Sequence, residues 1–413
     1  MQPFVRKDID QPRNPNYKKD IVYVTRHNKW VLNSLGVWPV MLKGVGKFLP
    51  KIAIGLYNLV LFFILMQCVL HVVFEQKDPV MILKVLGLIC FIFISIMKYW
   101  ALTARKSTIE YCIGQLYADW KQVEFQRDRK LMMKYGKLGR RLTMYSAVFM
   151  YCGGLSYVTL YAYVMQYAYE SYVDEFNRTI KMLLYPTYSA LYDVQKSPVH
   201  EIMYLLQCMC EYVSDSVTAG ACGLAALFVT HVCGQIDVVM SRIEDLIDGK
   251  FAEEDTSLNV RLVEIVQHHI RTLKFSAMIE TVLQEVCFFE FFGSTFIICL
   301  LEYYCIVDWE QDDKIGLTTY SLLLTSLTFN MFLLCYIGDL LIEKSTNVGI
   351  TCCMIDWYRL PAKTIQDLIL VIAMSNNPSK ISAGRIVDLS LASFGSVLKT
   401  SFAYLNFIRT TVT

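Results

Sequence analysis

Charge is scarce in this sequence, and the scarcity excludes several classes of protein. Charged residues make up 18% of the 413 residues, against about 25% in an average soluble domain. The 39 Lys and Arg residues and the 37 Asp and Glu residues nearly cancel. The chain therefore lacks the basic surplus that nucleic-acid-binding proteins carry, and we expect no nucleic-acid partner.

Catalytic and metal-binding motifs are also missing. The sequence contains no HExxH, GxSxG, Walker A or GxGxxG pattern. Cys352-Cys353 and Cys208-Met209-Cys210 have no partner at zinc spacing. Most of the 14 cysteines lie inside apolar runs, where cysteine acts as a small buried hydrophobe. These absences predict a protein that is not an enzyme and that holds neither a metal ion nor a cofactor.

Apolar residues, by contrast, are abundant: they make up 55% of the chain, and the mean hydropathy is +0.38. In a soluble protein this surplus would leave large exposed apolar patches. A helix needs about 20 apolar residues to cross the hydrocarbon core of a bilayer. Four uncharged runs reach this length and three further runs carry isolated charges: Ile52–Phe74, Leu142–Tyr169, Ser216–Ile236 and Ile315–Gly338, then Val80–Ala101, Val286–Val307 and Ile386–Ile408. The pattern predicts an all-α membrane protein with seven transmembrane helices.

The distribution of Lys and Arg predicts how these helices are oriented. Met1–Pro50, Arg105–Arg141 and Arg242–Lys274 carry nine, ten and five of them, whereas the alternate connections carry between one and three. We therefore expect a cytoplasmic N-terminus and an extracellular C-terminus, the inverse of a G-protein-coupled receptor. The N-terminal segment is polar and basic, so no secretory signal peptide is expected before the first span. The sequon at Asn177 falls in a connection expected to be extracellular and is a candidate glycosylation site.

Two spans are expected to extend into the cytoplasm as helical stalks. Thr256–Gln284 has apolar residues at helical spacing and runs without a breaker into the fifth span, and Ser216–Ile247 continues the fourth span similarly. Such stalks suggest an intracellular bundle where subunits associate; the alternative is a loop with local helix. The expected division is a cytoplasmic segment at 1–50, six transmembrane helices with a ligand pocket at 51–341, an intracellular anchor region at 342–378 and a pore-lining last helix at 379–413.

The last helix carries a polar face. After the helix expected over Leu360–Ser375, Asn376-Asn377-Pro378 breaks the chain, and Ser379–Arg409 is expected to form one helix. Polar and small residues then fall within about 60° of one another: Asp388, Ala392, Gly395, Lys399, Asn406 and Thr410. Ionisable residues in membrane helices normally face protein or water, so this face predicts either a pore lining or a hydrogen-bonded seam. Phe402, Tyr404 and Phe407 are candidates for an apolar constriction that closes by excluding water.

Aromatic and small residues gather in the outer halves of the second, third, fourth and sixth spans. A mostly apolar cavity with few polar groups suits a small hydrophobic ligand. The alternative, which periodicity alone favours, is that these residues form the core of the bundle, with small residues permitting close helix approach. The residues concerned are Phe91, Gly153, Gly154, Tyr157, Tyr161, Tyr212 and Tyr320.

These residues resemble those of the insect odorant receptors, and the chain looks like a ligand-tuning subunit. Near the N-terminus the resemblance rests on Trp30–Pro39, and in the fourth span on His231, Cys233 and Gln235, which match the family's H-x-C-x-Q spacing. The most specific match is C-terminal, where several pieces keep order and spacing: Tyr336–Ser345, Trp357–Pro361, Met374-Ser375 with Asn377-Pro378, Ser382–Gly384 and Val397–Leu405.

The resemblance implies a ligand-gated, non-selective cation channel in which four subunits surround a pore lined by the last helix. It implies that an odorant, a small hydrophobic volatile molecule, binds within each subunit, at Leu83, Gly87, Phe91, Gly154, Tyr157, Tyr161, Gln207, Cys208, Tyr212, Tyr320 and Leu324. It places the hydrophobic gate near Phe407, with Asn406, Thr410 and Thr411 as neighbours. Because polar residues there depart from the aliphatic gate of homomeric members, a hetero-oligomer with the odorant receptor coreceptor is implied, in the plasma membrane of sensory neuron dendrites.

Several alternatives remain at this stage. The coreceptor itself is a poor match, because only Asp248–Asp255 and its flanks stand where the coreceptor has a long insertion. The related gustatory receptors end in a TYxxxxxQF pattern, of which Ala403–Thr410 has only the Tyr. A metabotropic seven-helix receptor conflicts with the predicted orientation. A transporter using Asp388 and Lys399 is disfavoured because the sequence has no evident inverted repeat.

Overall fold

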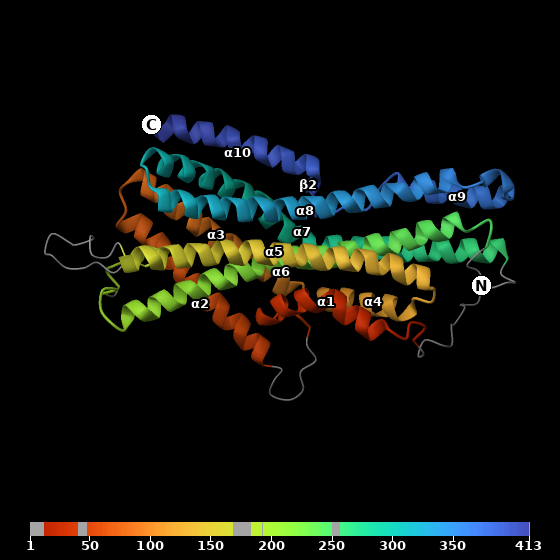
Figure 1. Ribbon diagram of the computed structural model, residues 1–413, viewed down its shortest axis with the longest axis horizontal. Helices are drawn as coiled ribbons and strands as arrows, with labels where there is room; N and C mark the ends of the chain where they lie inside the picture. Colours follow the sequence, from red (N-terminus) through yellow and green to blue (C-terminus); the bar gives the residue numbers. More distant parts are fainter. Residues whose placement is uncertain (1–11, 40–47, 168–182, 192, 250–256, 413) are drawn as a thin grey trace.

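The computed structural model describes residues 12–39, 48–167, 183–191, 193–249 and 257–412, and the side chains of 161–167 and 406–412 lie outside that description. Within it, the chain is almost entirely helical (Figure 1). The elements are α1 (Tyr17–Ser34), α2 (Leu49–Phe74), α3 (Pro79–Ala104), α4 (Lys106–Gln122), α5 (Gln126–Tyr167), α6 (Val199–Glu244), α7 (Leu258–Glu310), α8 (Lys314–Met354), the 3-10 turn η2 (Trp357–Arg359), α9 (Ala362–Ser375), strands β1 (Ser382–Ala383) and β2 (Val387–Asp388), and α10 (Leu391–Val412).

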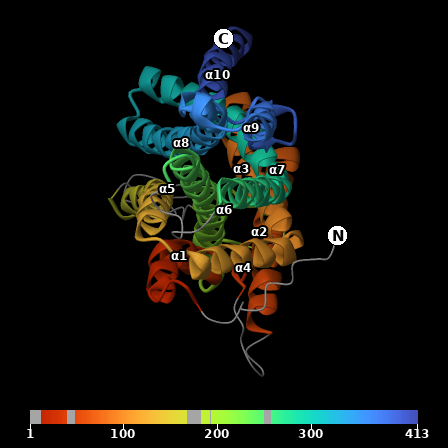
Figure 2. The ribbon, with the colours of Figure 1, turned by 90° about the vertical axis from the view of Figure 1, so that its right-hand side faces the viewer.

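Four long helices, α5 to α8, run along the longest axis of the molecule, and α9 lies at one end of this bundle (Figure 1). We call this the α9 end and the other the opposite end. Viewed along the axis, α6 occupies the centre, surrounded by α1, α5, α7 and α8 (Figure 2). α10 packs on the outside of α7 and α8. Within the described ranges, five helices are long and apolar enough to cross a membrane: α2, α3, α6, α7 and α8.

The expected stalks are confirmed as continuous helix. α7 has 53 residues, so it is about 80 Å long at 1.5 Å per residue, far more than a bilayer requires. Its apolar part at Val286–Val307 therefore leaves some 28 helical residues projecting toward the α9 end. α6 likewise continues to Glu244, and α9 begins directly after Pro361, as Pro at a helix start predicts.

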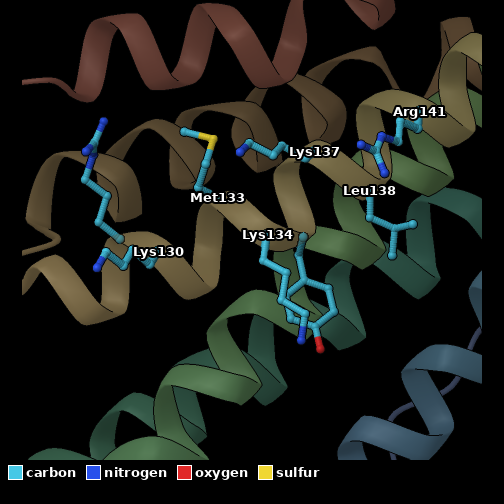
Figure 3. Close-up of a pocket in the computed structure, with 8 residues that line it drawn as sticks. Lys130, Met133, Lys134, Lys137, Leu138 and Arg141 are labelled. Carbon is cyan, nitrogen blue, oxygen red and sulfur yellow. The ribbon is translucent and has the colours of Figure 1, made fainter.

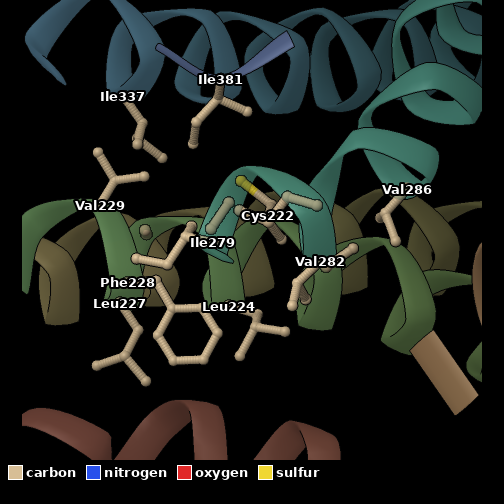
Figure 4. Close-up of a cluster of buried hydrophobic side chains, with 14 of the residues drawn as sticks. Cys222, Leu224, Leu227, Phe228, Val229, Ile279, Val282, Val286, Ile337 and Ile381 are labelled. Atoms are coloured by element: carbon tan, nitrogen blue, oxygen red, sulfur yellow. The ribbon is translucent and has the colours of Figure 1, made fainter. Parts of the chain in front are cut away.

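The run predicted as the fourth span, Ser216–Ile236, lies within α6, one of the helices long and apolar enough to cross a membrane. The antiparallel contact of α5 with α6 sets Gly139 against Thr230 and Gly154 against Asp215. By this register the part of α6 level with Leu142–Tyr167 lies at about residues 202–227, not 216–236. The C-terminal part of the apolar run is instead enclosed by protein, because α6 is buried almost continuously from residue 213 to 239. Apolar sequence here marks protein core rather than contact with lipid (Figure 4).

The last helix also differs from expectation. The chain from Ser379 to Ser390 is not helical; it forms the β1–β2 hairpin, in which Ser382 pairs with Asp388. Gly384 and Arg385 both have positive φ angles, 61° and 62°, which a continuous helix does not allow. The helix therefore begins at Leu391, twelve residues later than predicted. Asp388 consequently leaves the predicted helical stripe.

Polar contacts attach α1 to the long helices at the α9 end. Arg129 on α5 donates two hydrogen bonds, of 2.7 and 2.8 Å, to the buried carboxylate of Asp20. Burial alone would raise the pKa of Asp20, but the hydrogen bonds from Arg129 and Asn14 outweigh burial and lower it. Asn28 donates to Thr143 at 3.0 Å in the interior. The predicted N-terminal segment therefore contains a helix that belongs to the folded core.

Candidate functional site

The predicted ligand-binding residues fall into two groups. The first group lies where α5 and α6 contact the segment 183–186. The Tyr157 hydroxyl donates to the Leu184 carbonyl at 3.0 Å, and its ring stacks on that of Tyr185 with centroids 6.2 Å apart. Gln207 donates to the carbonyl of Tyr185 at 2.9 Å and accepts from its N–H at 3.1 Å. Cys208 is partly buried beside them. Side-chain bonds to backbone thus fix this segment over the opposite end of α5 and α6.

Two buried acids adjoin this first group, and sequence reasoning missed both. Glu211 and Asp215 stand one helical turn apart on α6 and are 6% and 4% exposed. Both carboxylates approach Gly154, where a Cβ would overlap Asp215 and lie 3.1 Å from Glu211. Glu211 accepts a short hydrogen bond from Tyr185. The sequence does hold a signal for them, because they are two acids at helical spacing just before the apolar run of α6. The prediction left both acids outside the fourth span.

The second group joins α3, α7 and α8. Tyr304, which sequence reasoning also missed, donates a short hydrogen bond to the Leu83 carbonyl and packs on Tyr320, with ring centroids 5.2 Å apart. Gly87 provides the room, because a Cβ there would overlap the Tyr304 side chain. Phe91 and Leu324 belong to the same apolar cluster. Lys84, whose Nζ lies over the Tyr320 ring at 5.5 Å from its centroid, forms an ion pair of 2.8 Å with buried Asp308.

The two groups approach each other along α5, because a Cβ on Gly153 would meet Ser326 and Leu323 of α8. Tyr212 is not brought to either group. Its ring stacks on Tyr151 at 6.0 Å, on the side of α6 that faces α1. The side chain of Tyr161 lies outside the described residues. Asn177 also lies outside them.

Below these groups, toward the α9 end, a buried polar network joins five helices. Lys98 on α3 donates at 2.6 Å to both Glu290 on α7 and Thr218 on α6. Glu290 also accepts from Asn330 on α8 at 3.0 Å, and Asn330 accepts from Ser146 on α5 at 2.7 Å. A buried charge is costly unless it is paired and hydrogen-bonded, and every carboxylate oxygen of Glu290 has a partner here.

The H-x-C-x-Q residues have structural roles. His231 Nε2 lies 2.9 Å from the Asp119 carboxylate of α4, which Arg271 of α7 also contacts at 2.8 Å. Gln235 Oε1 lies 2.6 Å from His268 Nε2, and Cys233 is fully buried. The motif therefore ties α6 to α4 and α7. No group of three or more potential metal ligands occurs among the residues that the structure describes.

The candidate pore residues are partly placed. Lys399 and Phe402 lie on the exposed side of α10, while Ser401 faces inward and donates to Glu302 of α7 at 3.0 Å. Asp388 lies in β2 and forms a half-exposed ion pair of 2.9 Å with Lys380. The side chains of Asn406, Phe407, Thr410 and Thr411 are outside the described part of α10.

Two cavities in the described residues have volumes of about 540 and 420 Å³, and both lie near the α9 end. Neither is lined by a residue of the two candidate ligand-binding groups. The larger cavity is a groove along α5 (Figure 3).

Comparison with known proteins identifies similar sequences and folds. Residues 78–402 match the family described as 7tm Odorant receptor. The chain is 22% identical over 223 residues to Odorant receptor 10 of Aedes albopictus and 26% identical over 241 residues to Odorant receptor 13a of Drosophila melanogaster. These matches cover 52% and 53% of this chain, and they span only 57% and 55% of the two relatives. The structure of the olfactory receptor OR5 from Machilis hrabei in complex with eugenol covers 96% of this chain and 100% of its own, with a TM-score of 0.77 at 14% identity.

Proposed function

The chain belongs to the 7tm odorant receptor family, and we propose that it is the odorant-binding subunit of a ligand-gated, non-selective cation channel. The observation that carries the proposal is the family match over residues 78–402 together with a fold shared with an insect olfactory receptor along 96% of the chain. The chain is a multi-pass membrane protein and not an enzyme. We propose further that it works with the odorant receptor coreceptor in a hetero-oligomer, in the plasma membrane of sensory neuron dendrites.

In this proposal α5 and α10 complete a set of seven spans with α2, α3, α6, α7 and α8, and the α9 end is cytoplasmic. The many Lys and Arg residues at that end support the orientation. α9 and the projecting parts of α6, α7 and α8 then form the anchor region where subunits associate. Asn177 would lie outside the cell.

The odorant site is proposed at the two aromatic groups. Tyr157, Tyr185, Tyr304 and Tyr320 supply aromatic rings. The hydroxyls of the first three already donate hydrogen bonds within the protein, so few of their polar atoms are left over. Such a site suits a small hydrophobic ligand held by shape and aromatic contact. An odorant would shift the channel toward the open state to the extent that it binds the open state more tightly than the closed state.

The pore is proposed along the exposed face of α10, beginning with Lys399 and Phe402. The gate is proposed near Phe407, with Asn406, Thr410 and Thr411. Because a dewetting gate needs apolar side chains, coreceptor subunits would supply part of the constriction.

Co-expression with the coreceptor tests this function. We expect a defined odorant panel to evoke a non-selective cation current only when both chains are present, and the current to survive block of G proteins. The chain alone and the coreceptor alone serve as controls. Loss of the current on G-protein block would contradict the proposal.

The pocket is tested by changing single side chains. We expect Tyr157→Phe and Tyr320→Ala to change the order in which odorants activate the channel, with surface expression maintained. A matched control is Tyr117→Phe on α4, an exposed residue far from both groups. An unchanged odorant ranking in both pocket variants would place the pocket elsewhere.

A further inference from the structure

A line of exposed cations runs along α5 toward the α9 end. Lys130, Lys134, Lys137 and Arg141 follow one another at steps of four, three and four residues, so they share one face of the helix within about 60°. All four are exposed. None has an acidic partner in the part of the chain that the structure describes. We call these four residues the basic stripe.

Neighbouring cations on the same helix already have partners within the protein. Arg127 pairs with Asp245, Arg129 with Asp20, and Arg140 donates to His27 at 3.1 Å. The four cations of the basic stripe therefore differ from their neighbours on α5, which are already bonded within the protein. Its members border the groove of about 540 Å³, with Met133 and Leu138 between them (Figure 3).

The same face of α5 becomes apolar immediately after Arg141. Continuing at the same spacing, it presents Tyr145, Val148 and Leu155, which are 43%, 50% and 63% exposed. Exposed apolar side chains in a row along a membrane protein are covered by lipid tails. A Tyr at the change from charge to apolar surface is typical of the headgroup level. The change between Arg141 and Tyr145 therefore marks where headgroups meet this helix.

We propose that the basic stripe and its groove bind the polyphosphorylated headgroup of an anionic phospholipid in the leaflet at the α9 end. This inference rests on the proposed span of α5. Lysines and arginines placed directly beside a span attract anionic headgroups. The stripe extends about 16 Å along the helix from Arg141 to Lys130, at 1.5 Å per residue. A single phosphate at the headgroup level contacts only the nearer cations, so a headgroup that carries several phosphates and projects from the bilayer fits the stripe.

Lipid binding by the full-length chain in nanodiscs tests the proposal without any odorant or current. The wild-type protein is compared with the variant K134Q/K137Q/R141Q, which removes three charges of the stripe. The control variant K77Q/K196Q/K314Q removes three exposed lysines at the opposite end. The probe is a fluorescent phosphatidylinositol bisphosphate in zwitterionic lipid, and phosphatidylserine at equal total charge provides the comparison.

We expect the stripe variant to bind the bisphosphate lipid at least tenfold more weakly than the wild type, and the control to stay within twofold. Wild-type affinity should exceed that for phosphatidylserine at least fivefold, and should fall as salt is raised. Three results would overturn the proposal: undiminished binding by the stripe variant, equal binding of phosphatidylserine, or equally tight binding of soluble inositol bisphosphate. The first would also fit a stripe that meets an acidic protein segment. Because no current is measured, failure here is separate from failure of the proposed channel function.

Discussion

Lys98 and Glu290, on α3 and α7, form a fully buried ion pair, with the Nζ and Oε2 atoms 2.6 Å apart and both side chains less than 5% exposed. The pair lies at the centre of hydrogen bonds that reach α6, α8 and α5. It therefore joins the helices that carry both candidate ligand-binding groups. A buried pair contributes little net stability, but removing one partner leaves an uncompensated charge in the interior.

Replacing Lys98 alone should therefore strongly reduce the stability of the protein. We expect Lys98→Met to destabilise the protein by about 3–5 kcal/mol, because Glu290 is left buried without a cation. Thermal unfolding of the detergent-purified protein measures this. The double variant K98M/E290Q keeps the hydrogen-bonding amide without the charge and should recover at least half of the loss. Equal stability of the single and double variants would show that the charge pairing is not the cause.

A substitution at Gly154 tests the role of the two buried acids beside the first candidate ligand-binding group. Gly154→Ala places a methyl group against Asp215 and Glu211, and overpacking of this kind costs about 1–3 kcal/mol. We expect the odorant-evoked current per surface receptor to fall at least fivefold. Gly55→Ala is the control, because nothing lies within 4 Å of a Cβ there. Identical dose–response curves for the two variants would argue against a site at Gly154.

The lowered pKa of His27 predicts that the stability of the protein depends on pH. Burial, followed by the charges of Arg140 and Arg26, lowers the pKa of His27 below its ordinary value of 6.5. The folded state therefore keeps His27 neutral while the unfolded chain takes up a proton, so stability is present above pH 6.5 and is lost as the pH falls below it. We expect the melting temperature to decrease between pH 7.5 and 5.5, and to decrease less in His27→Gln. An equal decrease in both proteins would assign the effect to other groups.

Gly338 holds the hairpin close to α8. A Cβ at Gly338 would overlap the backbone carbonyl of Leu389, and a backbone atom cannot move aside by rotating a side chain. We expect Gly338→Ala to destabilise the protein by about 1–3 kcal/mol and to alter the basal current. Gly395→Ala on α10, with open space around the site, should be neutral or stabilising by about 0.5–1 kcal/mol. The comparison is made by thermal unfolding and by recording from co-expressed channels.

The sequence predicted the helical class and the continuous stalks, because hydropathy and helical spacing are local properties. It also placed the break after α9 correctly, since Asn376-Asn377-Pro378 cannot continue a helix. It did not show that the apolar run of α6 packs against protein on all sides. Hydropathy alone cannot distinguish such a core from lipid contact.

The candidate site was predicted less completely than the fold. Tyr157 and Gln207 do lie in the same group, where they bond to the backbone of residues 184 and 185. Helical periodicity cannot predict such a contact. Glu211 and Tyr304 were missed because their importance arises only when helices distant in sequence come together. Asp388 was assigned to a helix because the turn at Gly384 and Arg385 interrupts an otherwise helical pattern.

The β1–β2 hairpin has a mechanical consequence for α10. Gly384 donates its N–H to Gln284 of α7 at 3.0 Å, and Leu389 lies against α8, so the foot of α10 is fastened on two sides. A helix fixed at its foot moves as a lever, and its displacement grows with distance from the pivot. Residue 407 lies about 24 Å above Leu391, so a tilt of only about 5° carries it about 2 Å sideways. In the pore proposed above, tilting of α10 would widen the opening most at the end farthest from Leu391.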